Sequence, residues 1–490
     1  MNSAELPEIF RPPVNRSMQV LDRAFFKKVV PLAAASIADA KEISNVRKEL
    51  DRAAALLRLN PIKTLREDDL SPGAKCLLLR PGIHPDQSST WPDALSILVD
   101  GGKAKIRPFD LTLTYNDWTM HNILEAILPE LPEEEKETPA GFAHVGHVVE
   151  NAIPTSEAHV NLRAAYLPYK KLIGEVLLDK NPTVKTVINK TLDVGVESVF
   201  RTFPYEVLAG EDDLDVTVHE AQCEFKFNFG KVYWNPRLGT EHSRLFEFFK
   251  EGEAVCDVMA GVGPFAVPAG KRKVFVRAND LNPDSFASLQ DAVKRNKVDG
   301  FVTASCQDGR IFIRKATRDL AMDPRSVVIP SKVKISRNAS DAEKRELKKA
   351  VEESAKTLNE PCAFSHYVMN LPATAIEFLD AFRGTHQGRE AEFRPHTTTK
   401  LPLIHLYLFQ AKYANEDEEL DEICQRISHH LGSQIRRDDP ELEMTIRYVR
   451  LVAPNKKMFC ASFRIPADVA FDQLPLNQSL SELAIKADAN

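Results

Sequence analysis

One nine-residue segment, Asp257–Phe265, holds the residues of this chain that are best suited to binding a ligand. Its sequence is Asp-Val-Met-Ala-Gly-Val-Gly-Pro-Phe, and it lies between two short apolar runs, Ala254–Cys256 and Ala266–Ala269. That order predicts a buried strand, a tight turn and the start of a helix. Gly261 and Gly263 carry no side chain, so the backbone of the turn can approach a ligand closely.

An acid follows this turn at a spacing that suits a nucleoside. The apolar run Val274–Asp280 predicts a second strand that ends in Asp280. A carboxylate at that place in a βαβ unit can bind both ribose hydroxyls. A dinucleotide site would need Gly-x-Gly-x-x-Gly, but here the third glycine is absent and Asp257 precedes the loop. The pattern resembles that of S-adenosylmethionine-dependent methyltransferases, in which Asp257 would face the amino group of the cofactor. An ordinary buried glycine turn is the alternative.

Two further strand ends carry polar residues. Asn370 and Pro372 follow the apolar residues Tyr367 and Val368 and would lie at the end of the fourth strand. The amide of an asparagine offers a donor and an acceptor to the edge of a planar nitrogen base. Asp308 and Gly309 end the predicted third strand, where an acid can meet the adenine amino group. Chance placement of Asn370 and an exposed turn at Asp308 remain the alternatives.

A helix predicted at 236–250 leads into the first of these strands. Thr240 is a candidate N-cap for it, which leaves Glu241 as a first-turn acid that the helix dipole favours. The alternative makes Glu241 a base beside the cofactor.

Length and composition restrict the class of protein. The chain has 490 residues, a net charge of −6 and no run of 18 apolar residues, so we expect two to four domains and no membrane span. Its seven cysteines form no Cys-x-x-Cys pair, which supports neither a zinc site nor a disulfide framework. Glu5 and Glu8 argue against a secretory signal, and we expect a cytoplasmic protein.

The expected fold class is α/β, with a Rossmann-like class I methyltransferase domain at 236–490. We expect an N-terminal domain at 1–138, ending in an acidic proline-rich linker, and a middle α+β domain at 139–235. A charged surface insertion is expected at 315–360. Residues 21–60 read as helical, 74–80 and 105–114 as strands, 115–129 and 172–178 as helices, and 446–453 and 458–465 as strands. The segment 161–202 has seven basic and four acidic residues, a local excess of three positive charges.

These motifs together resemble the eukaryotic and archaeal tRNA (guanine-37-N1) methyltransferases. The resemblance rests on Arg201, Lys231–His242, the glycine loop, Asn279–Pro283 and Asn370–Pro372, and it covers roughly 141–315 and 361–465. It implies S-adenosyl-L-methionine as cofactor, tRNA as substrate, no membrane partner and a monomer. It also implies that the N-terminal domain at 1–138 is a tRNA-recognition domain. It adds the mitochondrial matrix and the nucleus as further compartments. Residues 149–159 and the insertion are longer than the family pattern.

The resemblance also implies roles for single residues. Arg201 would face guanine O6, Glu241 would act as general base, and Asn370 with Pro372 would hold the base. The implied cofactor contacts are His242, Met259, Gly261, Gly263, Asp280, Leu281, Asp308, Gly309 and Asn370, and no metal is implied.

Two other functions stay open at this point. One is transfer of the aminocarboxypropyl group of the same cofactor to a tricyclic guanosine, which the segment Arg237–His242 disfavours. The other is a non-catalytic RNA-binding protein, against which Asp280, Glu241 and Asn370 argue.

Overall fold

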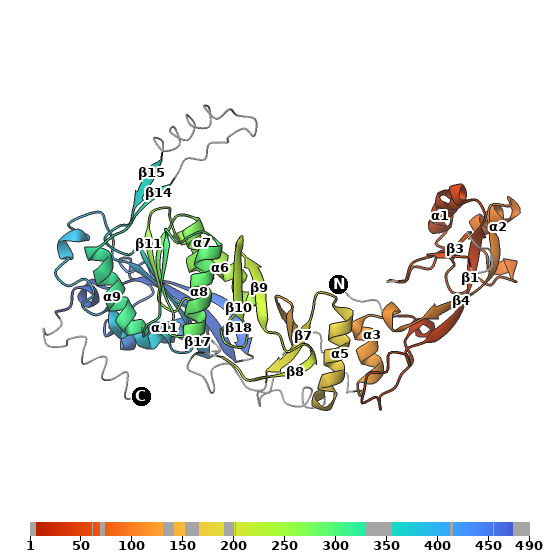
Figure 1. The fold of residues 1–490 in the computed structure, drawn as a ribbon, viewed down its shortest axis with the longest axis horizontal. Coiled ribbons are helices and arrows are strands. Elements are labelled where there is room, and N and C mark those ends of the chain that lie inside the picture. Colours follow the sequence, from red (N-terminus) through yellow and green to blue (C-terminus); the bar gives the residue numbers. More distant parts are fainter. Residues whose placement is uncertain are drawn as a thin grey trace. The chain divides into compact units, whose positions relative to one another are not determined.

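The computed structural model describes residues 6–60, 62–68, 74–130, 142–151, 166–190, 200, 202–329, 355–411, 415–453 and 455–473. The chain folds into two units, which are described separately (Figure 1). The first contains residues 1–143, 148–191 and 205–212, and the second contains 144–147, 192–204 and 213–490.

The first unit contains an antiparallel sheet in the order β2-β3-β1-β4. Its strands are β1 (Lys28–Ile37), β2 (Leu65–Glu67), β3 (Lys75–Leu78) and β4 (Lys105–Leu113). The prediction of helix throughout 21–60 is therefore wrong for β1. Val29 and Val30 begin a run that pairs along its length with β4, from Lys28 opposite Leu113 to Ser36 opposite Lys105. The spacing of apolar residues alone does not distinguish a short strand from a helix. Pairing with β3 and β4 stabilises the extended conformation here.

Helices of the first unit pack on this sheet and on a second, smaller one. They are α1 (Ile43–Arg52), α2 (Asp93–Asp100), α3 (Met120–Ile127) and α5 (Lys170–Lys180), with 3₁₀ turns at Glu8–Phe10, Ala40–Glu42, Ser88–Thr90, Tyr115–Asp117 and Leu167–Tyr169. The smaller sheet has β6 (Val148–Asn151) parallel to β7 (Thr186–Lys190), which pairs antiparallel with β8 (Tyr205–Gly210); β5 (Phe142–Val145) precedes them. The predicted strands at 74–80 and 105–114 and the helix at 172–178 are confirmed.

One hydrophobic core joins residues from both sides of position 138. Leu124 and Ile127 of α3 share it with Ile173 and Val176 of α5 and with Leu208 of β8. The packing therefore does not follow a boundary at 138. The division into 1–138, 139–235 and 236–490 stays a prediction, and the expected linker lies largely outside the described residues.

The second unit is built on a seven-stranded sheet in the order β13-β12-β11-β16-β17-β19-β18. Its strands are β11 (Ala254–Asp257), β12 (Phe275–Asn279), β13 (Val302–Ser305), β16 (His366–Met369), β17 (Leu403–Ala411), β18 (Thr445–Ala453) and β19 (Lys456–Arg464). The first five are parallel, whereas β19 runs antiparallel to both of its neighbours. This is the expected α/β Rossmann-like class.

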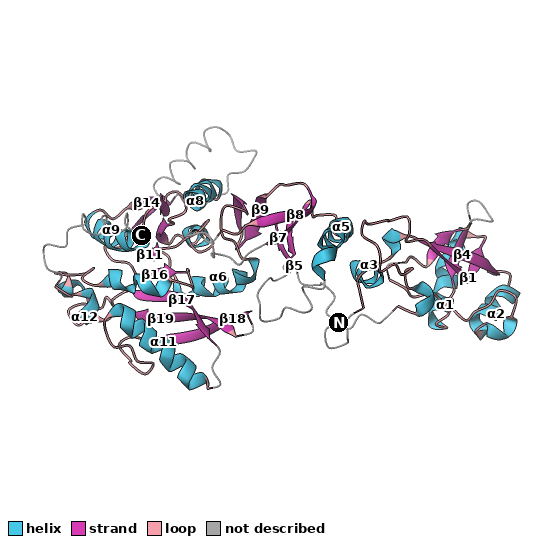
Figure 2. Cartoon of the chain, turned by 90° about the horizontal axis from the view of Figure 1, so that it is seen from below, coloured by secondary structure: helices cyan, strands magenta, loops and turns pink. Residues whose placement is uncertain are grey.

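Helices cover both faces of this sheet (Figures 1 and 2). One face packs against α9 (Gly309–Met322), the 3₁₀ helix η10 (Ala375–Phe382) and α11 (Glu416–Leu431), whose apolar residues form one core with Leu406 and Leu408 of β17. Side chains alternate along a strand, so Tyr407 points to the other face. The remaining helices of the unit are α6 (Gly239–Leu245), α7 (Ala266–Lys271), α8 (Pro283–Arg295) and α12 (Ala467–Ala470), with 3₁₀ turns at Pro236–Leu238, Phe246–Phe248 and Glu390–Glu392.

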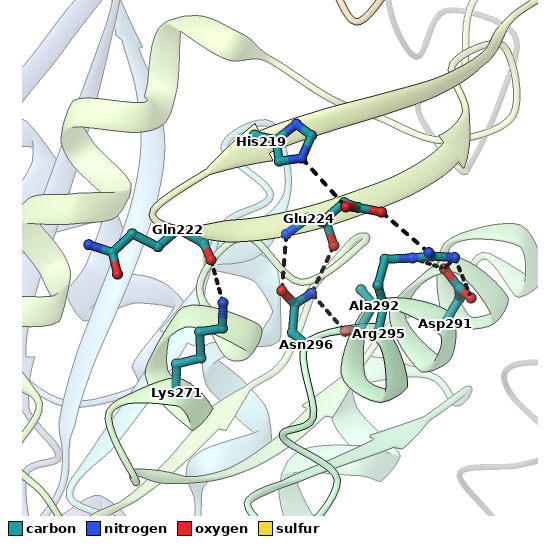
Figure 3. A network of polar contacts seen from close by, with 8 residues as sticks. All are labelled: His219, Gln222, Glu224, Lys271, Asp291, Ala292, Arg295 and Asn296. Atoms are coloured by element: carbon teal, nitrogen blue, oxygen red, sulfur yellow. Dashed lines mark hydrogen bonds and ion pairs between the residues drawn. The ribbon is translucent and has the colours of Figure 1, made fainter. Parts of the chain in front are cut away.

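A two-stranded hairpin, β9 (Asp215–Glu220) and β10 (Cys223–Asn228), packs on the helices of the second unit (Figure 3). The Asn296 side chain, just after α8, accepts from Glu224 N at 3.0 Å and donates to Glu224 O at 2.8 Å. Lys271 of α7 donates to the carbonyl of Gln222 at the hairpin turn. The hairpin is thus fixed to the sheet domain through its backbone.

The charged insertion begins later than expected. Residues 315–322 belong to α9, where Ala316, Thr317 and Leu320 are buried. The prediction that the insertion begins at 315 is wrong. The charged residues of this segment lie on the exposed face of α9, and its apolar residues form a regular stripe on the buried face. The hairpin β14 (Ser326–Ile329) and β15 (Lys356–Asn359) follows. Residues 330–354 of the expected insertion lie outside the described residues.

Within the described part of the chain, no helix is long and apolar enough to cross a membrane. The same residues contain no group of three or more His, Cys, Asp or Glu side chains that could hold a metal ion.

Candidate active site

The carboxyl ends of the parallel strands bring the predicted loop and acid together. Asp280, just after β12, accepts a hydrogen bond from Gly261 N at 2.8 Å through Oδ2 and from Asn282 N at 2.9 Å through Oδ1. Burial raises the pKa of Asp280, and the two backbone donors oppose that shift. The carboxylate therefore braces the glycine loop while keeping lone pairs for a ligand.

Glycine is favoured at both positions of the loop, for different structural reasons. Gly261 has φ +57° and Gly263 has φ +95°, conformations that residues with side chains seldom adopt. A Cβ on Gly263 would lie 2.6 Å from Leu289 Cδ1, so packing also requires glycine there. A Cβ on Gly261 would meet no atom within 4 Å, so Gly261 borders open space.

Buried polar atoms without partners mark the same edge of the sheet. Asp257 is fully buried, and neither carboxylate oxygen has a hydrogen-bond partner among the described residues. Burial and the charge of Asp280 raise the pKa of Asp257 well above its ordinary value. Asn370, just after β16, likewise has a buried Oδ1 without a described partner. Because such atoms are rare in folded proteins, they fit a site that receives a polar cofactor and a base.

Two asparagines of this site were not predicted to have a role. Asn279 donates to Val258 O at 3.2 Å and to Gln307 O at 2.9 Å, and it accepts from Gln307 N at 2.9 Å. Asn282 caps α8 and donates to Lys231 O at 2.8 Å. The first joins the ends of three strands, and the second connects the segment before α6 to Asp280. Their sequence signal was the polar run directly after a buried strand.

The remaining predicted cofactor residues have mixed surroundings. Asp308 caps α9, accepting from Arg310 N at 2.9 Å and Ile311 N at 3.2 Å through Oδ1. A Cβ on Gly309 would come within 3.0 Å of the Phe378 ring, which gives this glycine a packing reason. Leu281 is exposed, Met259 packs against the apolar core, and Pro372 is buried.

Glu241 lies in a buried network on α6. Arg244 donates to it twice, from Nε to Oε2 at 2.8 Å and from Nη2 to Oε1 at 2.6 Å, and Tyr407 Oη donates to Oε1 at 2.9 Å. Hydrogen bonding to Glu241 raises the pKa of Arg244, and burial raises that of Tyr407. A carboxylate accepts about four hydrogen bonds, so one position remains free. Arg244 and Tyr407 were not predicted from the sequence. Tyr407 lies in β17, and the strand order of the sheet brings it next to Glu241.

The expected N-cap role of Thr240 is wrong. The helical segment begins earlier, at the 3₁₀ turn Pro236–Leu238, where the Asn235 side chain accepts from Arg237 N, and α6 itself starts at Gly239. A proline at the first helical position favours this earlier start.

His242, the neighbour of Glu241, is buried against Phe265 of the glycine loop, with ring centroids 4.6 Å apart. Arg201 lies outside the described residues. In the segment 161–202, Lys170 pairs with Glu206 and Lys180 lies over the Tyr115 ring, so part of its basic charge is used within the protein.

The sheet order, the bent glycine loop and the acid after β12 define a class I methyltransferase domain. Two family models match: the TRM5/TYW2 methyltransferase domain at 216–327 and the TYW2 N-terminal domain at 120–213. A tRNA (guanine(37)-N(1))-methyltransferase of Aspergillus fumigatus is 50% identical over 97% of this chain and 98% of its own length. One of Emericella nidulans is 51% identical over 96% of each chain. The chain belongs to the tRNA (guanine(37)-N(1))-methyltransferase family.

The fold agrees with this assignment. A solved structure described as the complex of aTrm5 and tRNALeu matches with a TM-score of 0.53 and 19% identity, over 89% of this chain and all of that one.

Proposed function

We propose that this protein transfers the methyl group of S-adenosyl-L-methionine to N1 of guanosine 37 in tRNA. The observation that carries the proposal is the 50% identity over nearly the whole length to an enzyme of that name. The same near-full-length identity favours methyl transfer over aminocarboxypropyl transfer.

The residues at the strand ends fit the cofactor. Asp280 would bind the ribose hydroxyls, and the buried unpartnered carboxyl of Asp257 would meet the ammonium group. Gly261 lets the backbone approach, and the exposed side chain of Leu281 would cover the adenine. Asp308 keeps one oxygen, Oδ2, for the adenine amino group. When bound, the cofactor supplies an electrophilic methyl group on its sulfonium sulfur.

The chain's own residues would prepare the guanine. N1 of guanine carries a proton at neutral pH, and the free position on the Glu241 carboxylate would accept it, a contribution of roughly 10²–10⁴-fold. Negative charge then moves to O6, which we assign to Arg201 from the family resemblance; one good donor there contributes on the order of 3 kcal/mol. Asn370 Oδ1 would accept from the base edge, and Pro372 would fix the turn that carries it.

The tRNA must present the base outside its stack. Extrusion of a stacked nucleotide costs a few kcal/mol, and phosphate contacts would supply most of the compensating affinity. We further propose that the enzyme acts as a monomer, that its N-terminal residues take part in tRNA capture, and that it acts in the cytoplasm, with the mitochondrial matrix and nucleus as further compartments.

The test uses the full chain, methyl-labelled cofactor and an unmodified tRNA transcript with guanosine at position 37. We expect one label per tRNA, mapped to that nucleotide, and none in a transcript carrying adenosine there. A label at another nucleotide, or a product mass with an aminocarboxypropyl group, would contradict the proposal.

A further inference from the structure

His242 is held between a carboxylate and an aromatic ring. Its Nδ1 lies 2.5 Å from Glu220 Oε1, and the two side chains are 4% and 15% exposed. The Phe265 ring meets the imidazole edge-on. An ionised carboxylate can only accept hydrogen bonds, so Nδ1 carries the proton of this contact. The ring is therefore fixed in both orientation and tautomer.

The other ring nitrogen, Nε2, is buried and has no hydrogen-bond partner in the part of the chain that the structure describes. A buried nitrogen in this state costs free energy unless something binds it. None of the hydrogen bonds of the neighbouring Glu241 goes to His242, since its three described partners are two nitrogens of Arg244 and Tyr407 Oη. Nε2 is thus a buried polar atom that the described residues leave available to a ligand.

The position of His242 indicates which part of the cofactor it would meet. Asp280 follows β12, on one side of β11, whereas α6 contacts Tyr407 of β17, on the other side of β11 beyond β16. A nucleoside with its ribose at Asp280 must extend its 5′ substituent across the glycine loop, away from β12. His242 packs on Phe265 at the end of that loop. It therefore lies on the side of the amino-acid end of the cofactor.

Glu220 reaches His242 from the hairpin. It is the last residue of β9, and the turn after it has φ +48° at Ala221 and +62° at Gln222. The contacts of Asn296 and Lys271 with the hairpin backbone fix this turn on α7 and α8 (Figure 3). Gly239 leaves room for the carboxylate, because a Cβ there would lie 3.3 Å from Glu220 Oε2.

We propose that Glu220 is a positioning residue for cofactor binding, which holds His242 so that Nε2–H binds the α-carboxylate of S-adenosylmethionine. In the bound state the two ring nitrogens would both donate, Nδ1 to Glu220 and Nε2 to the cofactor carboxylate. Asp257 would meet the ammonium group, so that both charges of the amino-acid end have a partner. The inference rests on the proposed function, since it names a further residue of the same cofactor site.

The test measures binding by calorimetry of two ligands that differ in one group, S-adenosylmethionine and decarboxylated S-adenosylmethionine. Glu220→Gln keeps the size of the side chain and removes its charge. We expect it to weaken S-adenosylmethionine roughly tenfold and to change the decarboxylated ligand less than twofold. His242→Asn should change the two affinities in the same way. The double variant should bind S-adenosylmethionine as tightly as the single variant with the lower affinity, because Glu220 acts through His242.

Glu224→Gln is the matched control, because it removes a carboxylate from the same hairpin that contacts Arg295 instead of α6. It should leave both affinities unchanged, and thermal unfolding should show that all variants are folded. Equal losses for both ligands in Glu220→Gln, or no loss for either, would overturn the inference. A wild-type protein that binds neither ligand would instead contradict the proposed function.

Discussion

Replacing Glu241 with glutamine tests the central assignment of the site. The carboxylate makes three hydrogen bonds, two from Arg244 and one from Tyr407. Glutamine keeps the size but has one acceptor oxygen and cannot take a proton near neutral pH. We expect the single-turnover rate of methyl transfer to fall roughly 10²-fold or more.

The same change also has a structural cost. The amide NH₂ of glutamine would face one N–H of Arg244, whose side chain is only 17% exposed. Breaking a buried ion pair costs roughly 3–5 kcal/mol, and the partial exposure of Arg244 lowers this to roughly 1–3 kcal/mol. Urea unfolding measures this term separately from the rate, and calorimetry with S-adenosylmethionine shows whether the cofactor site is intact.

Tyr407→Phe separates the chemical from the structural role. It removes one hydrogen bond to Oε1, a loss of about 1 kcal/mol, and leaves the carboxylate and its Arg244 pair in place. We expect a stability loss at the lower end of the range given for Glu241→Gln, with most of the rate retained.

The assay uses saturating tRNA and labelled cofactor, with enzyme in excess over tRNA. A folded Glu241→Gln enzyme with the wild-type rate would show that the N1 proton goes elsewhere. A Tyr407→Phe rate as low as that of Glu241→Gln would show that Glu241 serves to anchor α6, in which case a first-turn carboxylate is a structural element.

Three further outcomes follow from other parts of the second unit. Asp280→Ala should weaken S-adenosylmethionine at least tenfold by calorimetry, because charge-assisted hydrogen bonds contribute about 1.5–3 kcal/mol; unchanged affinity would remove Asp280 from the site. Gly263→Ala should lower the unfolding free energy by about 2–3 kcal/mol, since its Cβ would meet Leu289, whereas Gly252→Ala, with φ +86° and no atom within 4 Å, should show only the smaller cost of backbone strain. Burial, aided by the Arg389 charge, lowers the pKa of His386 to about 3. The folded protein favours the neutral form of His386, whereas the unfolded chain binds a proton below a pKa near 6.5. The free energy of unfolding is therefore unaffected by this group above pH 6.5. It falls by at most about 1.4 kcal/mol per pH unit as the pH decreases from 6.5 toward 3. His386→Phe should flatten the stability profile in this window, and an unchanged slope would contradict the assignment.

Features that depend on residues close together in the chain could be predicted from the sequence. Asp257–Phe265 and Asp280 are close in the chain, and a strand, a glycine turn and an acid after the next strand have one common arrangement. Asn370 could be placed as well, because the end of a parallel strand lies at a known edge of the sheet. The strands β18 and β19 were likewise predicted from local patterns.

Features that depend on contacts between distant segments could be seen only in the tertiary structure. Glu241 and Tyr407 are 166 positions apart, and no local pattern relates them. The pairing of His242 with Glu220 depends on a hairpin that is fixed to α8 by Asn296. Strand β1 became a strand because two partners pair with it, and α9 continued past 315 because the core receives Ala316 and Leu320. Burial, charge state and partner choice at a site are set by the surroundings in space, and spacing along the chain contains no information on them.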